Sequence, residues 1–234
     1  MDSPADFNHR EFVDDKNSHR SRYDTPMMVA CSEEVKPEIF DLLMENIDKK
    51  NIKLEGQIRV KFEDRFEKYE PYVKEYNVLE EASSNFTNWR ATFALLKYIL
   101  NRPEYLNLIQ PELFYNACAF FNGAPLKFWK FMFENSEILG IEINAWVDGD
   151  WSFNCQRGFH RLVQKKNPNV PLINYILENA EKYKIDVDDT DSNYATPFLI
   201  ACQNGHAKQE QVIEAFIKHK HLINLNAKIG HVSH

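Results

Sequence analysis

The segments TPMMVACSEEV, from Thr25, and TPFLIACQNGH, from Thr196, place the same residue types in the same order far apart in the chain. Each begins with Thr-Pro, continues with three apolar residues and then has Ala-Cys. Recurrence of one local pattern indicates a repeat architecture, in which each unit buries its apolar face against its neighbours. We therefore expect a fold of stacked, similar units before any single residue is considered for chemistry.

Five such units can be aligned along the 234 residues, three of them on an Ala-Cys pair. Each unit has a short apolar segment of helical character, a polar turn and a longer amphipathic helix. The first shows the pattern clearly, because Ile39, Leu42, Leu43 and Ile47 recur at helical spacing. The units cover residues 23–54, 77–108, 111–145, 157–187 and 191–227.

The Thr-Pro pairs predict where helices begin. Thr25 and Thr196 are placed to accept a backbone N–H bond at a helix N-terminus, and each proline suits the first helical position. Pro37, Pro125 and Pro171 stand at or just before the first turn of longer helices. Gly205 and Gly123, each after an asparagine, are expected to end short helices in the left-handed conformation. The alanine of each Ala-Cys pair is small enough to let the neighbouring unit approach closely.

These residues resemble the ankyrin repeat, whose unit of about 33 residues has the pattern T-P-L-H-x-A, a turn and two helices. Thr196, Pro197, Phe198 and Ala201 match this pattern, and Leu199 stands where His is usual. In the RGFHRLV unit, Phe159-His160 match L-H, but Arg157-Gly158 replace T-P. IEINAW and INLNAK resemble the link from the second helix to the β-hairpin finger. The resemblance implies an all-α fold, an α-solenoid of about five repeats with short hairpin fingers and insertions.

The repeat pattern sets the expected domain limits. Residues 1–21 are polar and expected to be a flexible N-terminal segment, and residues 22–234 form the ankyrin-like domain. Residues 56–76, GQIRVKFEDRFEKYEPYVKEY, are an insertion that could be an extra helix. Residues 226–234 resemble the start of a further repeat that does not follow, which suggests a chain that is part of a longer product.

Composition narrows the class of partner. The net charge of −7 argues against binding to a nucleic-acid backbone, and no apolar run is long enough for a membrane helix. We expect a monomeric cytoplasmic protein, with the nucleus as an alternative. The cysteines lack C-x-x-C or zinc-like spacing. Because Cys31, Cys118 and Cys202 each follow an alanine, we interpret them as small buried packing residues.

No residue pattern predicts catalysis, a cofactor or a metal. His160 is interpreted as the histidine that braces a turn through a backbone hydrogen bond, although Cys155 lies five residues before it. His219 and His221 are two apart, which places them on different helix faces. The run with Asp188, Asp189 and Asp191 lacks the Gly and Glu of a calcium loop. Phosphate-binding glycine loops are absent.

The leading functional hypothesis is a non-catalytic protein-interaction module, an adaptor or scaffold. The resemblance implies that a partner protein binds the concave face, made of finger tips and the short inner helices. Acidic finger residues would favour a basic segment of that partner. Trp146 and Trp151 could be binding anchors or could pack on the neighbouring insertion. The candidate contacts are Tyr23, Trp146, Asp148, Asp150, Trp151, Asp189, Asp191, Asn193 and Tyr194 on fingers, and Arg161, Gln164 and Gln203 on inner helices.

A second hypothesis stays open. The chain could be the substrate-recruiting or inhibitory part of a larger enzyme or complex whose effector segment is missing from this sequence. A self-contained enzyme is a more distant alternative, and it would require a pocket that holds Cys155 and His160 within hydrogen-bond distance.

Overall fold

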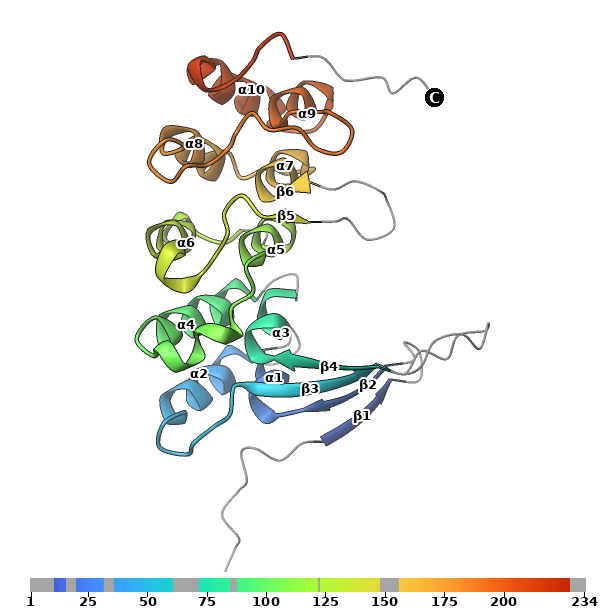
Figure 1. Ribbon diagram of the computed structural model, residues 1–234, viewed down its shortest axis with the longest axis vertical. Helices are drawn as coiled ribbons and strands as arrows, with labels where there is room; N and C mark the ends of the chain where they lie inside the picture. Colours follow the sequence, from blue (N-terminus) through green and yellow to red (C-terminus); the bar gives the residue numbers. More distant parts are fainter. Residues whose placement is uncertain are drawn as a thin grey trace, which may run out of the picture. The chain divides into compact units, whose positions relative to one another are not determined.

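The computed structural model describes residues 11–15, 20–31, 36–60, 72–84, 88–121, 123–147 and 156–227. The protein is mostly helical, and it divides into two compact units, Met1–Leu108 (unit 1) and Ile109–His234 (unit 2). In the part of the chain that the structure describes, no helix has the length and apolar character needed to cross a membrane. Among the described residues, each of the five segments contains a pair of α-helices, as the sequence predicts (Figure 1).

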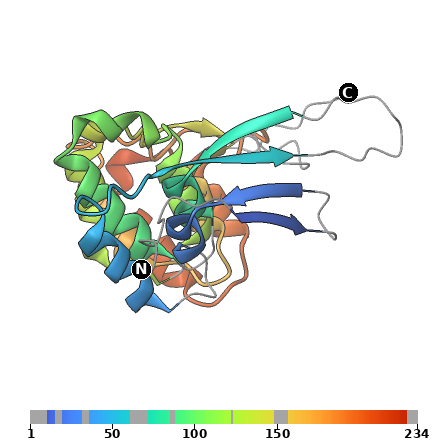
Figure 2. The same ribbon diagram turned by 90° about the horizontal axis from the view of Figure 1, so that it is seen from below.

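Unit 1 combines two helix pairs with an antiparallel sheet of order β1-β2-β3-β4. Figure 2 shows the four strands side by side. Phe12 of β1 pairs with Tyr23 of β2, and Ile58 of β3 pairs with Arg22 and Lys74 on either side. The elements are β1 (Glu11–Asp15), β2 (Arg20–Asp24), α1 (Pro26–Ala30), α2 (Pro37–Asn46), β3 (Glu55–Val60), β4 (Tyr72–Asn77), α3 (Val78–Ser84), α4 (Trp89–Leu100) and the 3-10 helix η1 (Pro103–Leu108).

This sheet corrects two expectations. Residues 11–15, 20 and 21 form strands, so a flexible segment over 1–21 is wrong for these positions. Residues 56–60 and 72–76 are also strands, so a helical insertion over 56–76 is wrong at both ends, and residues 61–71 lie outside the described part. The physical reason for β3 is that polar and apolar residues alternate in QIRV, with the two-residue period of a strand. β4 is rich in Tyr and Val, which favour strands.

Side-chain caps connect the strands of unit 1 to its helices. Thr25 follows β2 and its hydroxyl accepts from Met28 N at 3.3 Å, as predicted. Asn77 ends β4 and caps α3, since its side-chain oxygen accepts from Leu79 N and Glu80 N. In return, Asn77 N donates to the Glu80 carboxylate at 2.8 Å, which completes a capping box. The strand-to-helix junctions are thus fixed by local hydrogen bonds.

Unit 2 has two layers of helices. In the first layer α7 packs against α5 and α9, and in the second α8 lies against α6 and α10 (Figure 1). The interior includes Phe114, Trp129, Phe133, Leu162 and Ile176, all almost fully buried. The elements are α5 (Leu113–Phe120), α6 (Leu126–Leu139), β5 (Trp146–Val147), β6 (Gln156–Arg157), α7 (Gly158–Gln164), α8 (Val170–Glu178), α9 (Pro197–Gln203), α10 (Gln209–Lys218) and the 3-10 helix η2 (Lys220–Leu222).

The helix ends of unit 2 follow the predictions in part. Thr196 caps α9 by accepting from Leu199 N at 3.2 Å, and Gly123 has a φ of 84° after α5. The left-handed conformation predicted for Gly205 is wrong, because α9 ends at Gln203 with Asn204 extended. The positive φ in this turn lies at Lys208, the residue before α10. Of the last segment, residues 228–234 lie outside the described part.

Candidate functional site

The hairpin β5–β6 presents Trp146 at the surface of unit 2. Trp146 pairs with Arg157 across the two strands, and its side chain is 45% exposed. The guanidinium of Arg157 lies over the indole ring, 5.5 Å from the centroid. The strand pairing and the contact with the guanidinium both restrict the conformations of this exposed indole. Binding of a partner would therefore cost little further conformational entropy at this side chain.

Arg157 also ties this hairpin to the loop before α9. Its Nε donates to the Asp189 carboxylate, and its Nη1 donates to the Asn144 carbonyl. Both side chains of the ion pair are about three-quarters buried, with 23% and 27% of their surfaces exposed. A hydrogen-bonded, partly buried pair of this kind is expected to hold the two loops in one geometry.

His160 adds a second link to the same loop. Its Nε2 lies 3.0 Å from the Asp189 carbonyl oxygen, so this nitrogen donates the hydrogen bond. The prediction that His160 braces a turn is therefore confirmed. Burial lowers the pKa of the imidazole below its ordinary value of 6.5, and a neutral ring with the proton on Nε2 fits the site. Cys155, its suggested companion, lies outside the described residues.

The loop between α8 and α9 is closed by Asp191. Its carboxylate accepts from Asn193 N and Ala195 N, each at 2.9 Å, and the residue is 8% exposed. This turn places Tyr194 at a φ of 60° with 52% of its side chain exposed. Asp191 is thus a structural residue that positions an exposed aromatic side chain.

Further hydrogen bonds join successive loops of unit 2. Asn144 donates to the Lys184 carbonyl at 2.7 Å and accepts from Asp186 N at 3.0 Å. One loop later, the Asp188 carboxylate accepts from Asn224 N at 3.0 Å. Burial raises the pKa of Asp188. The loop before α9 is therefore held by the side chain of Asn144, and the segment after η2 is held by the side chain of Asp188, each from outside its own turn.

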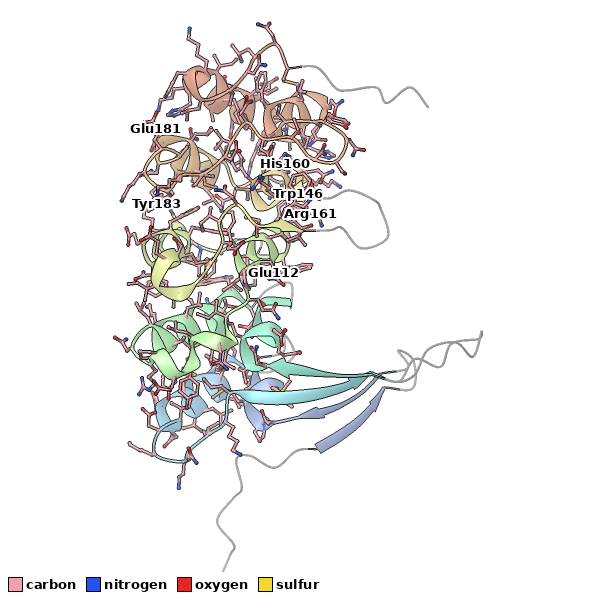
Figure 3. The ribbon with its side chains drawn as sticks, in the orientation of Figure 1. Glu112, Trp146, His160, Arg161, Glu181 and Tyr183 are labelled. Atoms are coloured by element: carbon pink, nitrogen blue, oxygen red, sulfur yellow. The ribbon has the colours of Figure 1, made fainter. Side chains whose placement is uncertain are left out.

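The predicted contact residues fall into three groups. We define the first-layer surface as Trp146 on β5 and Tyr194 in the loop before α9, together with Arg161, Gln164 and Gln203 on α7 and α9. Trp146, Tyr194, Gln164 and Gln203 are exposed and Arg161 is half-buried. Figure 3 shows Trp146 and Arg161 on one side of unit 2, with Glu181 and Tyr183 on the opposite side. Asn193 is exposed beside Tyr194.

The second group corrects the electrostatic expectation. Asp189 and Asp191 were expected to offer acidic contacts, but the first is paired with Arg157 and the second is buried in its own turn. The third group is not placed. Asp148, Asp150 and Trp151 lie outside the described residues, and Tyr23 belongs to β2 of unit 1, where its side chain is not described.

A groove with cationic walls was missed by the sequence analysis. It lies at the end of α5 and in the turns that follow α5 and α7, and it has a volume of about 370 Å³. We call it the Lys165 groove, and it is lined by Ala119, Phe121, Gly123, Leu162, Lys165, Lys166, Asn167 and Asn169. Burial lowers the pKa of Lys165, and the positive charge of Arg161 lowers it further. The sequence signal was KKNPN, a basic run in a turn between two helices.

The cysteines divide by exposure. Cys31 and Cys118 are buried as predicted, and burial raises the pKa of both thiols. Cys202 is exposed at the end of α9, so the prediction of a buried thiol is wrong there. Adjacent residues of a helix point in different directions. In α9 the side chain of Ala201 is buried, and that of Cys202 is exposed. Within the described ranges, no group of three His, Cys, Asp or Glu side chains could hold a metal ion.

No family model, curated protein or solved structure matches the chain in comparisons with known proteins.

Proposed function

We propose that this chain is a non-catalytic protein-interaction module of the ankyrin-repeat type, which binds a partner protein through the first-layer surface of unit 2. In a solenoid of such repeats this surface lies on the concave side, where an extended and rigid site is available. The observation that carries this proposal is that Trp146 on the β5–β6 hairpin and Tyr194 on the loop before α9 are exposed, while long-range hydrogen bonds join this hairpin to this loop.

The order of elements supports the repeat assignment. A strand pair precedes the short helix of a pair at three places, namely β1–β2 before α1, β3–β4 before α3 and β5–β6 before α7. The alanines of three short helices, Ala30, Ala117 and Ala201, are at most 3% exposed. A small residue at the same place in each unit allows the close approach that stacking requires.

The first-layer surface has the composition of a binding site. Large aromatic side chains and arginine supply most of the binding energy in protein interfaces, and this surface offers two exposed aromatics beside Arg161. The Arg157–Asp189 ion pair and the His160 hydrogen bond reduce the ordering that a partner would otherwise have to impose. A preorganised polar and aromatic surface suits recognition better than chemistry.

Affinity purification from cell extract with quantitative mass spectrometry tests this proposal. Three forms of the full chain are compared: wild type, a first-layer variant with Trp146→Ala and Arg161→Glu, and a matched control with Glu181→Lys. Glu181 is an exposed residue on the opposite side of unit 2 (Figure 3). Circular dichroism establishes that all three forms fold alike.

We expect a set of proteins that wild type and the Glu181→Lys control retain and that the first-layer variant loses. Replacement by alanine of an aromatic side chain that is buried in the complex typically reduces the binding free energy by about 2 kcal/mol or more. A loss of this size is enough to remove a partner during washing. Equal recovery by all three forms, or selective loss from the Glu181→Lys form, would refute the first-layer surface as the binding site.

A further inference from the structure

Helix α2 carries two large aliphatic side chains that the fold of unit 1 leaves exposed. Ile39 is 48% exposed and Leu42 is 59% exposed. They are three residues apart, which makes them neighbours on the helix surface. Asn46 is half-buried and continues the same stripe four residues further along. We call these three residues the α2 stripe, and their spacing is the one by which a helix packs along a second helix.

The rest of α2 is fixed within unit 1, so the α2 stripe has a defined direction. The buried face of the helix consists of Phe40, Leu43 and Ile47. Just after the helix, the Asp48 carboxylate accepts from the Tyr98 hydroxyl at 2.6 Å and forms an ion pair with Arg102. A helix that is held by its buried face and by its C-terminal end needs little further ordering when a partner binds.

The charged residues within α2 are all acidic, namely Glu38, Asp41 and Glu45. Each is exposed, and in the described part of the chain none of them forms an ion pair. Glu38 directly precedes Ile39, and Glu45 directly precedes Asn46. At helical spacing these two glutamates therefore border the α2 stripe on the side away from the buried face.

This border determines the charge of a suitable occupant. The nearest lysines in the sequence stand outside the helix, at Lys36, Lys49 and Lys50. A helix that lies along α2 thus meets aliphatic side chains with carboxylates on their open border. Charges beside an apolar seam set the choice of partner in paired helices, and the complement of a carboxylate is Lys or Arg.

Two other occupants fit this surface less well. A second copy of the chain would bring the same three carboxylates to the seam, and like charges oppose its docking. A helix that lies on a membrane surface is typically rich in Lys or Arg on its polar face, and α2 contains neither. The acidic border therefore favours a basic partner over both.

We infer that α2 docks an amphipathic helix of a partner protein, with aliphatic residues along one face and Lys or Arg beside them. The aliphatic side chains of that helix cover Ile39 and Leu42, and its cations lie against Glu38 and Glu45. This inference goes beyond the proposed function, because the first-layer surface belongs to unit 2 and contains no residue of α2. The helix has only 10 residues, so the contact is short and suits reversible binding.

Two synthetic helical peptides provide the probes. Both have Ile and Leu at alternating spacings of three and four residues, and they differ only beside this stripe, where the basic peptide has Lys and the acidic peptide has Glu. Fluorescence anisotropy measures the affinity of each labelled peptide for the full chain. The stripe variant carries Ile39→Ala and Leu42→Ala, and the charge variant carries Glu38→Lys and Glu45→Lys.

Matched controls replace exposed residues of unit 2. Ile138→Ala with Ile217→Ala removes two aliphatic side chains that are 61% and 53% exposed. Glu142→Lys with Glu181→Lys reverses two exposed charges. Circular dichroism establishes that all forms fold alike, and Leu42→Ala alone is the milder form of the stripe variant.

We expect wild type to bind the basic peptide at least about tenfold more tightly than the acidic peptide. The stripe variant should weaken binding of the basic peptide by about tenfold, because the exposed aliphatic contacts are lost. The charge variant should reverse the preference, so that the acidic peptide binds more tightly. Both controls should bind as wild type does, and added salt should weaken binding of the basic peptide.

Equal affinity of wild type for the two peptides would overturn the inference, as would binding of the basic peptide that neither α2 variant changes. Self-association in analytical ultracentrifugation that the stripe variant loses would assign α2 to a second copy instead. Binding to anionic lipid vesicles that the same variant loses would assign it to a membrane. The first-layer variant should bind the basic peptide as wild type does, so failure of the proposed function and failure of this inference are separate results.

Discussion

Gly158 begins α7 at a point where that helix lies against α5. A Cβ atom at this position would lie 2.9 Å from Cδ1 of Phe114 and 3.2 Å from Cα of Tyr115. Neither neighbour can move easily. The Phe114 ring is 1% exposed and is enclosed by Trp129 and Phe133, with ring centroids 6.2 and 5.3 Å away. Tyr115 opposes the new atom with its backbone.

Gly158→Ala should therefore destabilise the protein. Overpacking of a closely packed interior costs about 1–3 kcal/mol. The higher helix propensity of alanine offsets at most about 1 kcal/mol. The net loss is then about 1–2 kcal/mol in the free energy of unfolding. Urea unfolding followed by circular dichroism measures it, and hydrogen exchange should show the loss of protection in α5 and α7.

Gly205→Ala is the matched control. No atom lies within 4 Å of a Cβ built at Gly205, and its backbone is not left-handed. Alanine at such a position stabilises by about 0.4–1 kcal/mol, because it reduces the freedom of the unfolded chain. The two substitutions should thus act in opposite directions. Equal unfolding free energies for both variants would refute the close approach of α7 to α5.

Three other predictions concern the site and the thiols. Arg157→Gln should lower the free energy of unfolding by about 1–3 kcal/mol, because it removes charged hydrogen bonds to Asp189 and the Asn144 carbonyl; urea unfolding measures it, and an unchanged midpoint contradicts it. Burial lowers the pKa of His160, so the unfolded state binds its proton first, and stability should fall as the pH decreases below about 6.5. His160→Gln should flatten that part of the pH profile, and an identical slope argues against it. Thiol labelling with peptide mapping should modify Cys202 well before Cys31 or Cys118 in the native protein, and simultaneous modification would contradict the burial of the latter two.

Local patterns in the sequence were sufficient to predict the helix pairs and several of their ends. Apolar residues at helical spacing follow directly from the need of an amphipathic helix to bury one face. The caps at Thr25 and Thr196 depend only on atoms three residues away. The capping box of Asn77 and Glu80 was also readable, as N-x-x-E before a helix. Interactions this short are encoded within a single segment.

The sheet of unit 1 was not predicted, although its strands carry the signal. The charged and aromatic composition of residues 56–76 favoured the interpretation of an extra helix, and the two-residue period of QIRV was overlooked. Pairing of β2 with β3 joins residues 20–23 to 57–60, so it depends on contacts between distant segments. The partner of a strand cannot be read from that strand alone. Composition gave the wrong answer here because a strand with polar residues on one face resembles a charged helix.

The environments of the candidate contact residues were predicted unevenly for a similar reason. Exposed aromatics such as Trp146 in β5 and Tyr194 in a turn could be identified from residue type and local context. The roles of Asp189 and Asp191 could not, because a carboxylate serves equally well as a surface charge, an ion-pair partner or a turn acceptor. The role of Asp189 as an ion-pair partner depends on Arg157, which lies 32 residues earlier in the chain. Only the folded arrangement decides which of these roles each carboxylate takes.

The pair Arg157-Gly158 departs from Thr-Pro, and the departure has a physical consequence. Arg157 makes no side-chain cap to α7, whereas Thr25 and Thr196 each cap their helix. The missing cap costs about 1 kcal/mol. In return the arginine pairs with Asp189 and lies over Trp146, while the glycine admits Phe114 of α5. This unit therefore lacks a stabilising helix cap and has instead an arginine that contacts an exposed aromatic side chain. Departures of this kind from a local stabilising rule are expected at functional sites. The departure from Thr-Pro therefore lies next to the β5–β6 hairpin, which carries Trp146 of the proposed first-layer surface.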